Sequence, residues 1–181
     1  MLITFLKSNK QKQTGFTLIE ILVSLLILSI GLLGLAALQL TGMKRNQSAH
    51  YRSLAANLAY EIADRIRVNR TTTYTTATGA PGAATNCVTN ACNTATMATY
   101  DITYWKCSLG GWDTDTDCTG LGIEGDLPSG DGSITPDTPS AGIYRVTVMW
   151  DDERTGATGK TCPANPNPAN DLTCFTMEFV P

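Results

Sequence analysis

The pattern of hydrophobic and polar positions divides the chain into parts with different periodicity. From Phe16 to Leu40 nearly every position is apolar or small, and Glu20 is the only charged residue in that run. A run of about 25 residues, at a rise of about 1.5 Å per residue, is longer than the roughly 30 Å hydrocarbon core of a bilayer. It also exceeds the roughly 7–15 residues of an ordinary signal-peptide core. The pattern therefore predicts a membrane-spanning helix.

The helical pattern continues beyond Leu40 and becomes amphipathic. Apolar residues recur there at intervals of three and four, which is typical of one face of a helix. The residues of this stripe are Tyr51, Leu54, Ala55, Leu58, Ala59, Ile62 and Ile66. Because the first proline is Pro81, we expect one continuous helix from about Phe16 to Arg70. Its first half (16–40) would span the membrane, and its second half (41–70) would pack one face against a head domain.

The segment that follows the helix changes in composition. Residues 71–99 contain eleven Thr and no charged residue, and together with the breaker Gly79–Gly82 they predict an extended surface loop. The stretch Met97–Trp105 fits a helix or a strand. Alternating apolar positions in Tyr144–Trp150 and Thr173–Val180 predict two strands. We therefore expect an α+β fold, in which a small antiparallel sheet packs against the second half of the long helix.

Charge is distributed unevenly along the chain. Residues 1–70 carry nine Lys and Arg against three acids, whereas residues 71–181 carry four against thirteen. The basic part fits a membrane-proximal segment, and the acidic part fits an extracytoplasmic head of residues 71–181. An acidic head argues against nucleic acid as a partner, because phosphate contacts need clustered Lys and Arg.

All six cysteines follow the predicted helix. They are Cys87, Cys92, Cys107, Cys118, Cys162 and Cys174. An even number of cysteines in a region rich in Gly, Thr and Pro favours disulfides formed in an oxidising compartment. Zinc is the alternative, but there is no CxxC and the only histidine, His50, lies far upstream. Six cysteines allow 15 pairings, and the local pairs Cys107–Cys118 and Cys162–Cys174 are our preferred guess.

The residues around the start of the apolar run suggest its topology. Residues 1–14 contain three lysines and no acid, which predicts a cytoplasmic N-terminus and an exported remainder. A conventional signal peptide cut near Gly34 and Ala36, or a generic single-pass anchor, would be alternatives. Glu20 argues against these two alternatives. Placing a carboxylate within an apolar span costs a few kcal/mol of free energy, so such a residue is a functional candidate. A snorkelling side chain near the interface is the simpler explanation of Glu20 alone.

The segment Lys12–Glu20 has the sequence Lys-Gln-Thr-Gly-Phe-Thr-Leu-Ile-Glu. It resembles the class III signal of type IV pilins and of the pseudopilins of type II secretion. The resemblance implies that a prepilin peptidase removes a leader of residues 1–15 by cutting between Gly15 and Phe16. Phe16 would then be N-methylated, and Glu20 would pair with the Phe16 amine of a neighbouring subunit. A cationic amine nearby keeps a buried carboxylate charged, and the pairing favours one axial register between neighbouring subunits.

Further stretches resemble the minor pilin called type IV pilus modification protein (PilV-like). They are Ser29–Leu35, Ala55–Arg70, Leu127–Gly132 and Tyr144–Asp152. This resemblance implies a minor pilin, a structural subunit of the type IV pilus that acts in pilus assembly or priming, with adhesion and twitching motility as family functions. It would lie in the bacterial inner membrane before assembly and in the pilus or at the cell surface afterwards. Its partners would be other pilins, contacted through the helix. A type II secretion pseudopilin is the alternative, and an exported enzyme on a membrane anchor is a remote one.

Few residues are suited to catalysis. The one histidine lies on the predicted helix, and no Ser-His-Asp, Cys-His or metal-ligand constellation is present, so we expect no enzymatic activity, no cofactor and no small-molecule substrate. One acidic motif matches positions 1, 3, 5 and 12 of a calcium-binding loop. Its residues are Asp113, Asp115, Asp117 and Glu124. Because Cys118 replaces the glycine of that loop, we favour an acidic, solvated loop and expect no metal.

Overall fold

A computed structural model describes residues 15–137, 142–162 and 170–181. The predicted leader up to residue 14 and the proline-rich stretch from Pro163 to Pro168 lie outside the described residues. The chain divides into two compact units, Met1–Lys44 and Arg45–Pro181, and each is described by itself below.

Helix α1 spans Leu18–Val68 and has 51 residues. The expected long helix is confirmed, and its ends lie two residues inside the predicted ones. Within the second unit, α1 buries the stripe that the sequence predicted, and only Leu54 of that stripe is partly exposed. The buried residues are Tyr51, Ala55, Leu58, Ala59, Ile62, Ala63 and Ile66. The spacing of apolar residues thus identified the face of α1 that packs in the head.

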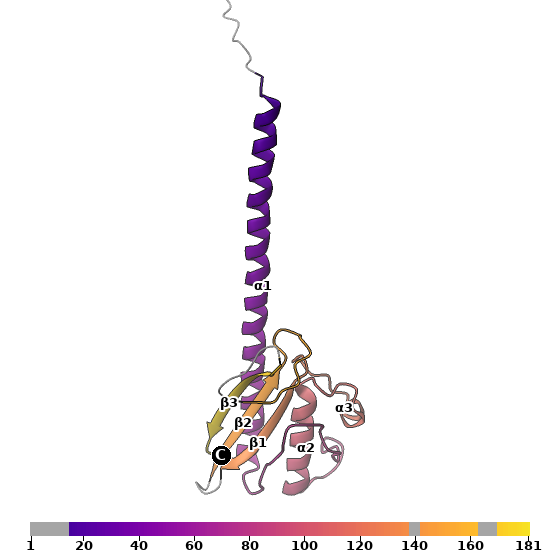
Figure 1. The fold of residues 1–181 in the computed structure, drawn as a ribbon. Helices are drawn as coiled ribbons and strands as arrows, with labels where there is room; N and C mark the ends of the chain where they lie inside the picture. Colours follow the sequence, from indigo (N-terminus) through magenta and orange to yellow (C-terminus); the bar gives the residue numbers. More distant parts are fainter. Residues whose placement is uncertain (1–14, 138–141, 163–169) are drawn as a thin grey trace, which may run out of the picture. The chain divides into compact units, whose positions relative to one another are not determined.

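The head contains a three-stranded antiparallel sheet in the order β1-β2-β3 (Figure 1). Its strands are β1 (Asp131–Asp137), β2 (Ile143–Trp150) and β3 (Thr173–Phe179). β2 and β3 are the two predicted strands. The sequence did not predict β1, which carries Gly132 and Pro136 in place of a clear alternation. Proline is tolerated in β1 because β1 is an edge strand of the sheet.

The sheet and the second-unit part of α1 share one hydrophobic core. The alternate β2 residues Tyr144, Val146, Val148 and Trp150 are all buried in it, as their spacing predicted. Each fully buried side chain of this size contributes about 1.5–3 kcal/mol relative to its exposed state. The expected packing of the sheet against the helix is therefore confirmed.

Helix α2 (Thr94–Ser108) begins inside the segment that we expected to be an extended loop. Asn93 caps it by accepting a hydrogen bond from the Thr96 amide at 2.9 Å. Such a cap satisfies one of the free amides at a helix start. The ambiguous stretch Met97–Trp105 is thus helical, and the Trp105 indole donates to the Leu58 carbonyl of α1 at 2.9 Å. The Thr-rich segment before Asn93 contains no helix among its residues, although Thr76 forms a bridge with Ile134 of β1.

Candidate functional site

The predicted cleavage site lies just before α1. Gly15, Phe16 and Thr17 are outside the helix, all three are exposed, and Phe16 is 79% exposed. Nothing lies within 4 Å of the position that a Cβ on Gly15 would take. A peptide bond in a non-helical, exposed segment is accessible to a protease. The geometry at Gly15–Phe16 is therefore compatible with proteolytic processing.

Glu20 lies in the first turn of α1. Its amide donates to the Thr17 carbonyl at 3.1 Å, and the Ile21 amide donates to the same carbonyl at 3.3 Å. The side chain is exposed, and none of the described residues forms an ion pair with it. A carboxylate at a helix N-terminus gains about 0.3–1 kcal/mol from the helix dipole. Glu20 can thus accept a cation from outside the described chain.

The first unit exposes a continuous apolar surface on α1. This helix is long and apolar enough to cross a membrane, and it is the only such helix among the described residues. Apolar side chains along it are at least half exposed, from Leu18 to Leu40. A patch of this size in water marks a surface that contacts lipid or another protein. The apolar helix and the acid at its start form the candidate functional segment.

The six cysteines form three disulfides in the head, as the sequence predicted. Cys107 pairs with Cys118 and Cys162 with Cys174, which are the two local pairs that we preferred, and Cys87 pairs with Cys92. Their Cα–Cα distances are 5.3, 6.3 and 5.6 Å, in the same order. All three lie in the usual range for a disulfide.

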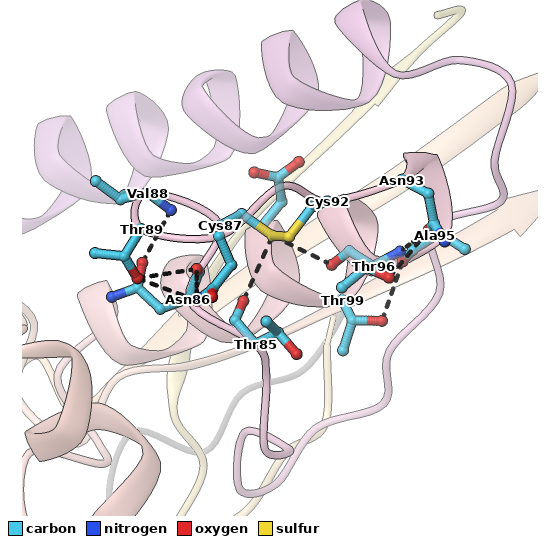
Figure 2. The surroundings of a disulfide bond; sticks show 12 residues. Thr85, Asn86, Cys87, Val88, Thr89, Cys92, Asn93, Ala95, Thr96 and Thr99 are labelled. Carbon is cyan, nitrogen blue, oxygen red and sulfur yellow. Dashed lines mark hydrogen bonds between the residues drawn. A yellow bond between two sulfur atoms is a disulfide. The ribbon is translucent and has the colours of Figure 1, made fainter.

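The Cys87–Cys92 disulfide closes a small loop just before α2 (Figure 2). Asn86 stabilises the loop by accepting a hydrogen bond from the Val88 amide at 2.9 Å. Val88, which lies between the two cysteines, is 80% exposed. This disulfide therefore ties down part of the Thr-rich segment, for which the sequence predicted an extended loop held in part by Cys87 and Cys92.

The acidic motif of the head uses its carboxylates to hold backbone amides. Asp115 caps α3 (Thr116–Leu121) by accepting from the Asp117 amide at 2.9 Å. Asp113 accepts from the Gly125 amide at 3.0 Å. Within the described residues no group of three or more His, Cys, Asp or Glu is placed to hold a metal ion. Cys118, which replaces the glycine of a calcium loop, is instead disulfide-bonded to α2.

A partly buried ion pair that the sequence did not predict joins α1 to α2. Arg65 Nη1 lies 2.9 Å from Asp101 Oδ1, and the Tyr74 hydroxyl donates to Asp101 Oδ2 at 2.7 Å. Burial alone would lower the pKa of Arg65, but its hydrogen bonds to Asp101 and Glu61 raise that pKa overall. Burial, followed by the bond to Asp101, raises the pKa of Tyr74. In the sequence, the only indication of the Arg65–Asp101 contact was that Arg65 lies beside the predicted apolar stripe.

A second buried cluster centres on Asp131. Its carboxylate accepts from the Gly79 amide at 2.8 Å and from the Gly132 amide at 2.7 Å. It also pairs with Lys160 at 2.6 Å and with Lys106 at 3.4 Å. The Lys106 ammonium is buried, and burial lowers its pKa, although the Asp131 carboxylate opposes this shift. This cluster ties α2, the Thr-rich segment and the loop that follows β2 to the start of β1.

Comparisons with known families match two adjoining segments. Residues 10–36 match the family described as "Prokaryotic N-terminal methylation motif", and residues 37–103 match the family described as "Type IV pilin Tt1218". The first match covers Gly15, Phe16 and Glu20, and the second covers the α1 stripe and the start of α2. No curated protein and no solved structure matches the chain.

Proposed function

We propose that this chain, whose two family matches support membership of the type IV pilin superfamily, is a minor pilin that takes part in pilus assembly or priming. The matches support a structural subunit of the pilin type, and the pilin family is not enzymatic. The finer assignment to minor pilins of the PilV-like kind is supported by the sequence stretches from Ser29 to Leu35 and from Leu127 to Gly132. Adhesion and twitching motility are family functions that come with this assignment.

One observation carries the proposal. Glu20 is an acid in the first turn of an exposed apolar helix, and it lies four residues after Phe16, which the predicted cleavage would leave as the new N-terminus. Cleavage between Gly15 and Phe16 by a prepilin peptidase leaves a new amine at Phe16, which is then methylated. In an apolar environment a lone carboxylate is costly, whereas a carboxylate next to a cationic amine stays charged. The amine of one subunit therefore pairs with Glu20 of the next and sets their register.

The localisation follows from the same segment. Before assembly, the apolar half of α1 spans the inner membrane, with the basic leader in the cytoplasm and the head outside. During assembly, the same apolar surface moves from lipid to the helices of other pilins, so the helix needs no change in its hydrophobic face. The disulfides of the head fit an oxidising, extracytoplasmic compartment.

The proposal is tested by measuring how much of the protein enters filaments when Glu20 is changed. We expect Glu20→Gln, which removes the charge at nearly constant shape, to lower the amount in sheared filaments at least about tenfold, the effect of about 1.4 kcal/mol. Glu20→Asp keeps the charge and should retain part of the incorporation. Glu61→Gln is the matched control, because Glu61 is a partly exposed carboxylate of the same helix. Normal incorporation of Glu20→Gln would rule out the pairing.

Mass spectrometry of the mature N-terminus checks the processing step on the same material. A chain that starts at N-methylated Phe16 supports the proposal. A start near Ala37, or an intact Met1, would instead support a conventional signal peptide or a simple anchor. If the chain is processed at Phe16 but its deletion affects protein secretion and leaves pili unchanged, the protein is a type II secretion pseudopilin.

A further inference from the structure

The part of α1 that follows the apolar run carries cations without partners. From position 21 to position 60 the chain has no acid, and its only Lys and Arg there are Lys44, Arg45 and Arg52. Arg45 and Arg52, both in the second unit, are exposed, and neither forms an ion pair with any described residue. Because they are seven positions apart, they lie on the same face of α1, about 10 Å from each other along its axis. We call this face, formed by Arg45 and Arg52, the basic face.

Most other cations of the second unit are paired with acids of the same chain. These are Arg65, Arg67, Lys106, Arg145 and Lys160. Arg154 donates to the Tyr51 hydroxyl at 2.9 Å, in a loop that also contains Asp151, Asp152 and Glu153. Tyr51 is buried against the head and points about 100° around α1 from Arg52, so this loop approaches another side of the helix. The basic face thus keeps its positive charge uncompensated within the part of the chain that the structure describes.

The head carries uncompensated charge of the opposite sign. From position 107 to position 144 the chain has seven acids and no Lys or Arg. Three of these acids, Asp113, Glu124 and Asp126, flank α3 in the sequence, are exposed, and form no ion pair within the described ranges. Protein surfaces usually intersperse the two signs. The separation of unpaired cations on α1 from unpaired acids on the head indicates a contact between the basic face of one chain and the acidic head of another.

The side chains around the basic face suit a protein partner. Tyr60, on the same side of α1 and eight positions after Arg52, is 54% exposed, although tyrosine is largely apolar. Tyr and Arg are the residue types that most often carry binding energy in protein interfaces. Ala49 and Ala56 lie between these larger residues on the helix, and neither is buried. Their small side chains leave room for another chain to approach the helix between the arginines and Tyr60.

Anionic lipid is the other partner to weigh, because the basic face follows a segment suited to a membrane. The headgroup region adds only about 5–7 Å on each side of the hydrocarbon core. Arg45 follows Leu40 by five positions, which is about 7 Å of helix, whereas Arg52 follows it by twelve positions, which is about 18 Å. Headgroups therefore reach Arg45 and not Arg52. The two arginines together favour an acidic protein surface.

We propose that the basic face of α1 docks on the acidic head of a neighbouring pilin subunit. This inference rests on the proposed function, because a filament is what brings a second head to this part of α1. The chain has both a basic face and an acidic head, so the contact is head-to-tail and can repeat along a filament. Exposed ion pairs are weak one at a time, but subunits held in register by Glu20 meet at a high effective concentration. The contact selects neighbours, because a head with a basic surface is repelled.

The first test changes the basic face in the full chain and measures how much of the protein enters sheared filaments. We expect the double variant Arg45→Gln/Arg52→Gln to enter at least about fivefold less than the wild type, the effect of two lost exposed ion pairs. Its N-terminal processing and the melting temperature of its head should not change. Arg70→Glu is the matched control: it changes the net charge by the same amount, at an exposed cation without an ion pair among the described residues.

Normal incorporation of the double variant, or an equal loss in Arg70→Glu, overturns the proposal. Loss of the double variant from the membrane fraction before assembly also overturns it, because lipid is then the partner.

The second test identifies the surface that the basic face contacts. A carbodiimide joins an amine to a carboxylate as an amide and takes up the water that is released, and Lys44, next to Arg45, supplies the amine. In treated filaments of the wild type, peptide mass spectrometry of the crosslinked dimer band should find Lys44 joined to an Asp or Glu of a pilin head. A chain that enters filaments but gives no such product overturns this contact alone. A wild-type chain that is absent from filaments overturns the proposed function as well.

Discussion

The carboxylate of Asp131 is bonded to two lysines and to two backbone amides at the start of β1. Lys106, one of these lysines, is buried and also donates to the carbonyls of Ala77 and Gly79 at 2.6 and 2.5 Å. A buried cation stays charged only where acceptors surround it. Asp131 therefore makes the burial of Lys106 possible.

Asp131→Asn should lower the free energy of unfolding of the head by about 3 kcal/mol or more, because it leaves the buried Lys106 without a counter-charge. For a domain of this size the melting temperature should fall by about 10 °C. Differential scanning calorimetry of the oxidised protein measures both quantities. Asp126→Asn is the control: Asp126 is exposed, so we expect a change within about 0.5 kcal/mol. Equal effects of the two changes would contradict the role given to Asp131.

Tyr74 gives a prediction on pH. Its pKa is raised by burial and by the bond to Asp101, so the folded state holds the hydroxyl proton more tightly than the unfolded state does. This contribution to stability is complete below the unfolded pKa of about 10, and it is lost as the pH rises through the raised pKa. The stability of the wild-type protein should therefore fall more steeply above pH 10 than that of Tyr74→Phe.

Melting temperatures of Tyr74→Phe and of the wild type, measured at a series of pH values from 8 to 12, check this prediction. The pKa of Lys106 is lowered, so deprotonation of Lys106 raises stability over an overlapping range. That effect is present in both proteins and cancels in the difference between them. Parallel curves would mean that the Tyr74 hydroxyl does not titrate as proposed.

The residues discussed here differ in how well they could be predicted from the sequence. Gly15, Phe16 and Glu20 are close in sequence, so their spacing could be read without a structure. Asp101 is 36 positions from Arg65, and only folding brings the two together. Lys106 was not predicted to be buried, because lysine is almost always exposed. Long-range polar partners are thus the part of the head that sequence patterns do not contain.

At the level of elements, the helices and strands that could be predicted are those with a regular spacing of hydrophobic residues. The stripe on α1 and the alternation in β2 each repeat over several turns or residue pairs, and the structure confirms both. β1 was missed because its central residues include Ser133, Thr135 and Pro136, which carry no apolar alternation. It is an edge strand of the sheet, paired along its length with β2 and bridged on its other side at Thr76, so fewer of its positions need to be apolar. α2 was ambiguous because its buried face includes Asp101, Thr103 and Lys106.

The disulfides differ in burial, which leads to a prediction on their reduction. Cys107 and Cys118, which join α2 to α3, are both fully buried, whereas Cys87 and Cys92 are partly exposed. Limited reduction followed by alkylation should therefore label Cys87 and Cys92 before Cys107 and Cys118, as measured by peptide mass spectrometry. Labelling of Cys107 before Cys87 in the folded protein would contradict the burial described here.

The same disulfides should differ in their effect on stability. Loop-closure entropy predicts about 3 kcal/mol for the Cys107–Cys118 pair, with a separation of 11, and about 2 kcal/mol for the Cys87–Cys92 pair, with a separation of 5. Replacing each pair by alanine and comparing urea unfolding curves tests this order. The buried pair also loses packed sulfur atoms, which adds to its effect.

At the scale of the whole molecule, the two units have different surfaces. The first unit exposes apolar side chains along α1 and contains the acid Glu20. Among the described residues, those that form the buried core all lie in the second unit, and the first of them is Tyr51. The exposed apolar helix of the first unit should make the full chain poorly soluble in water. The residues that stabilise the folded head lie in the second unit.

The fragment Arg45–Pro181 should therefore fold without the apolar helix. Every core residue among the described residues lies within it, and all three disulfides do too. We expect a soluble monomer by size-exclusion chromatography, with a melting temperature within a few degrees of that of the head in the full chain. A fragment that starts at residue 60 is the control: it lacks Tyr51, Ala55 and Leu58, and loss of these contacts should cost several kcal/mol and unfold it. If the longer fragment aggregates while oxidised, the first unit contributes to folding of the head, and the division into two independent parts is wrong.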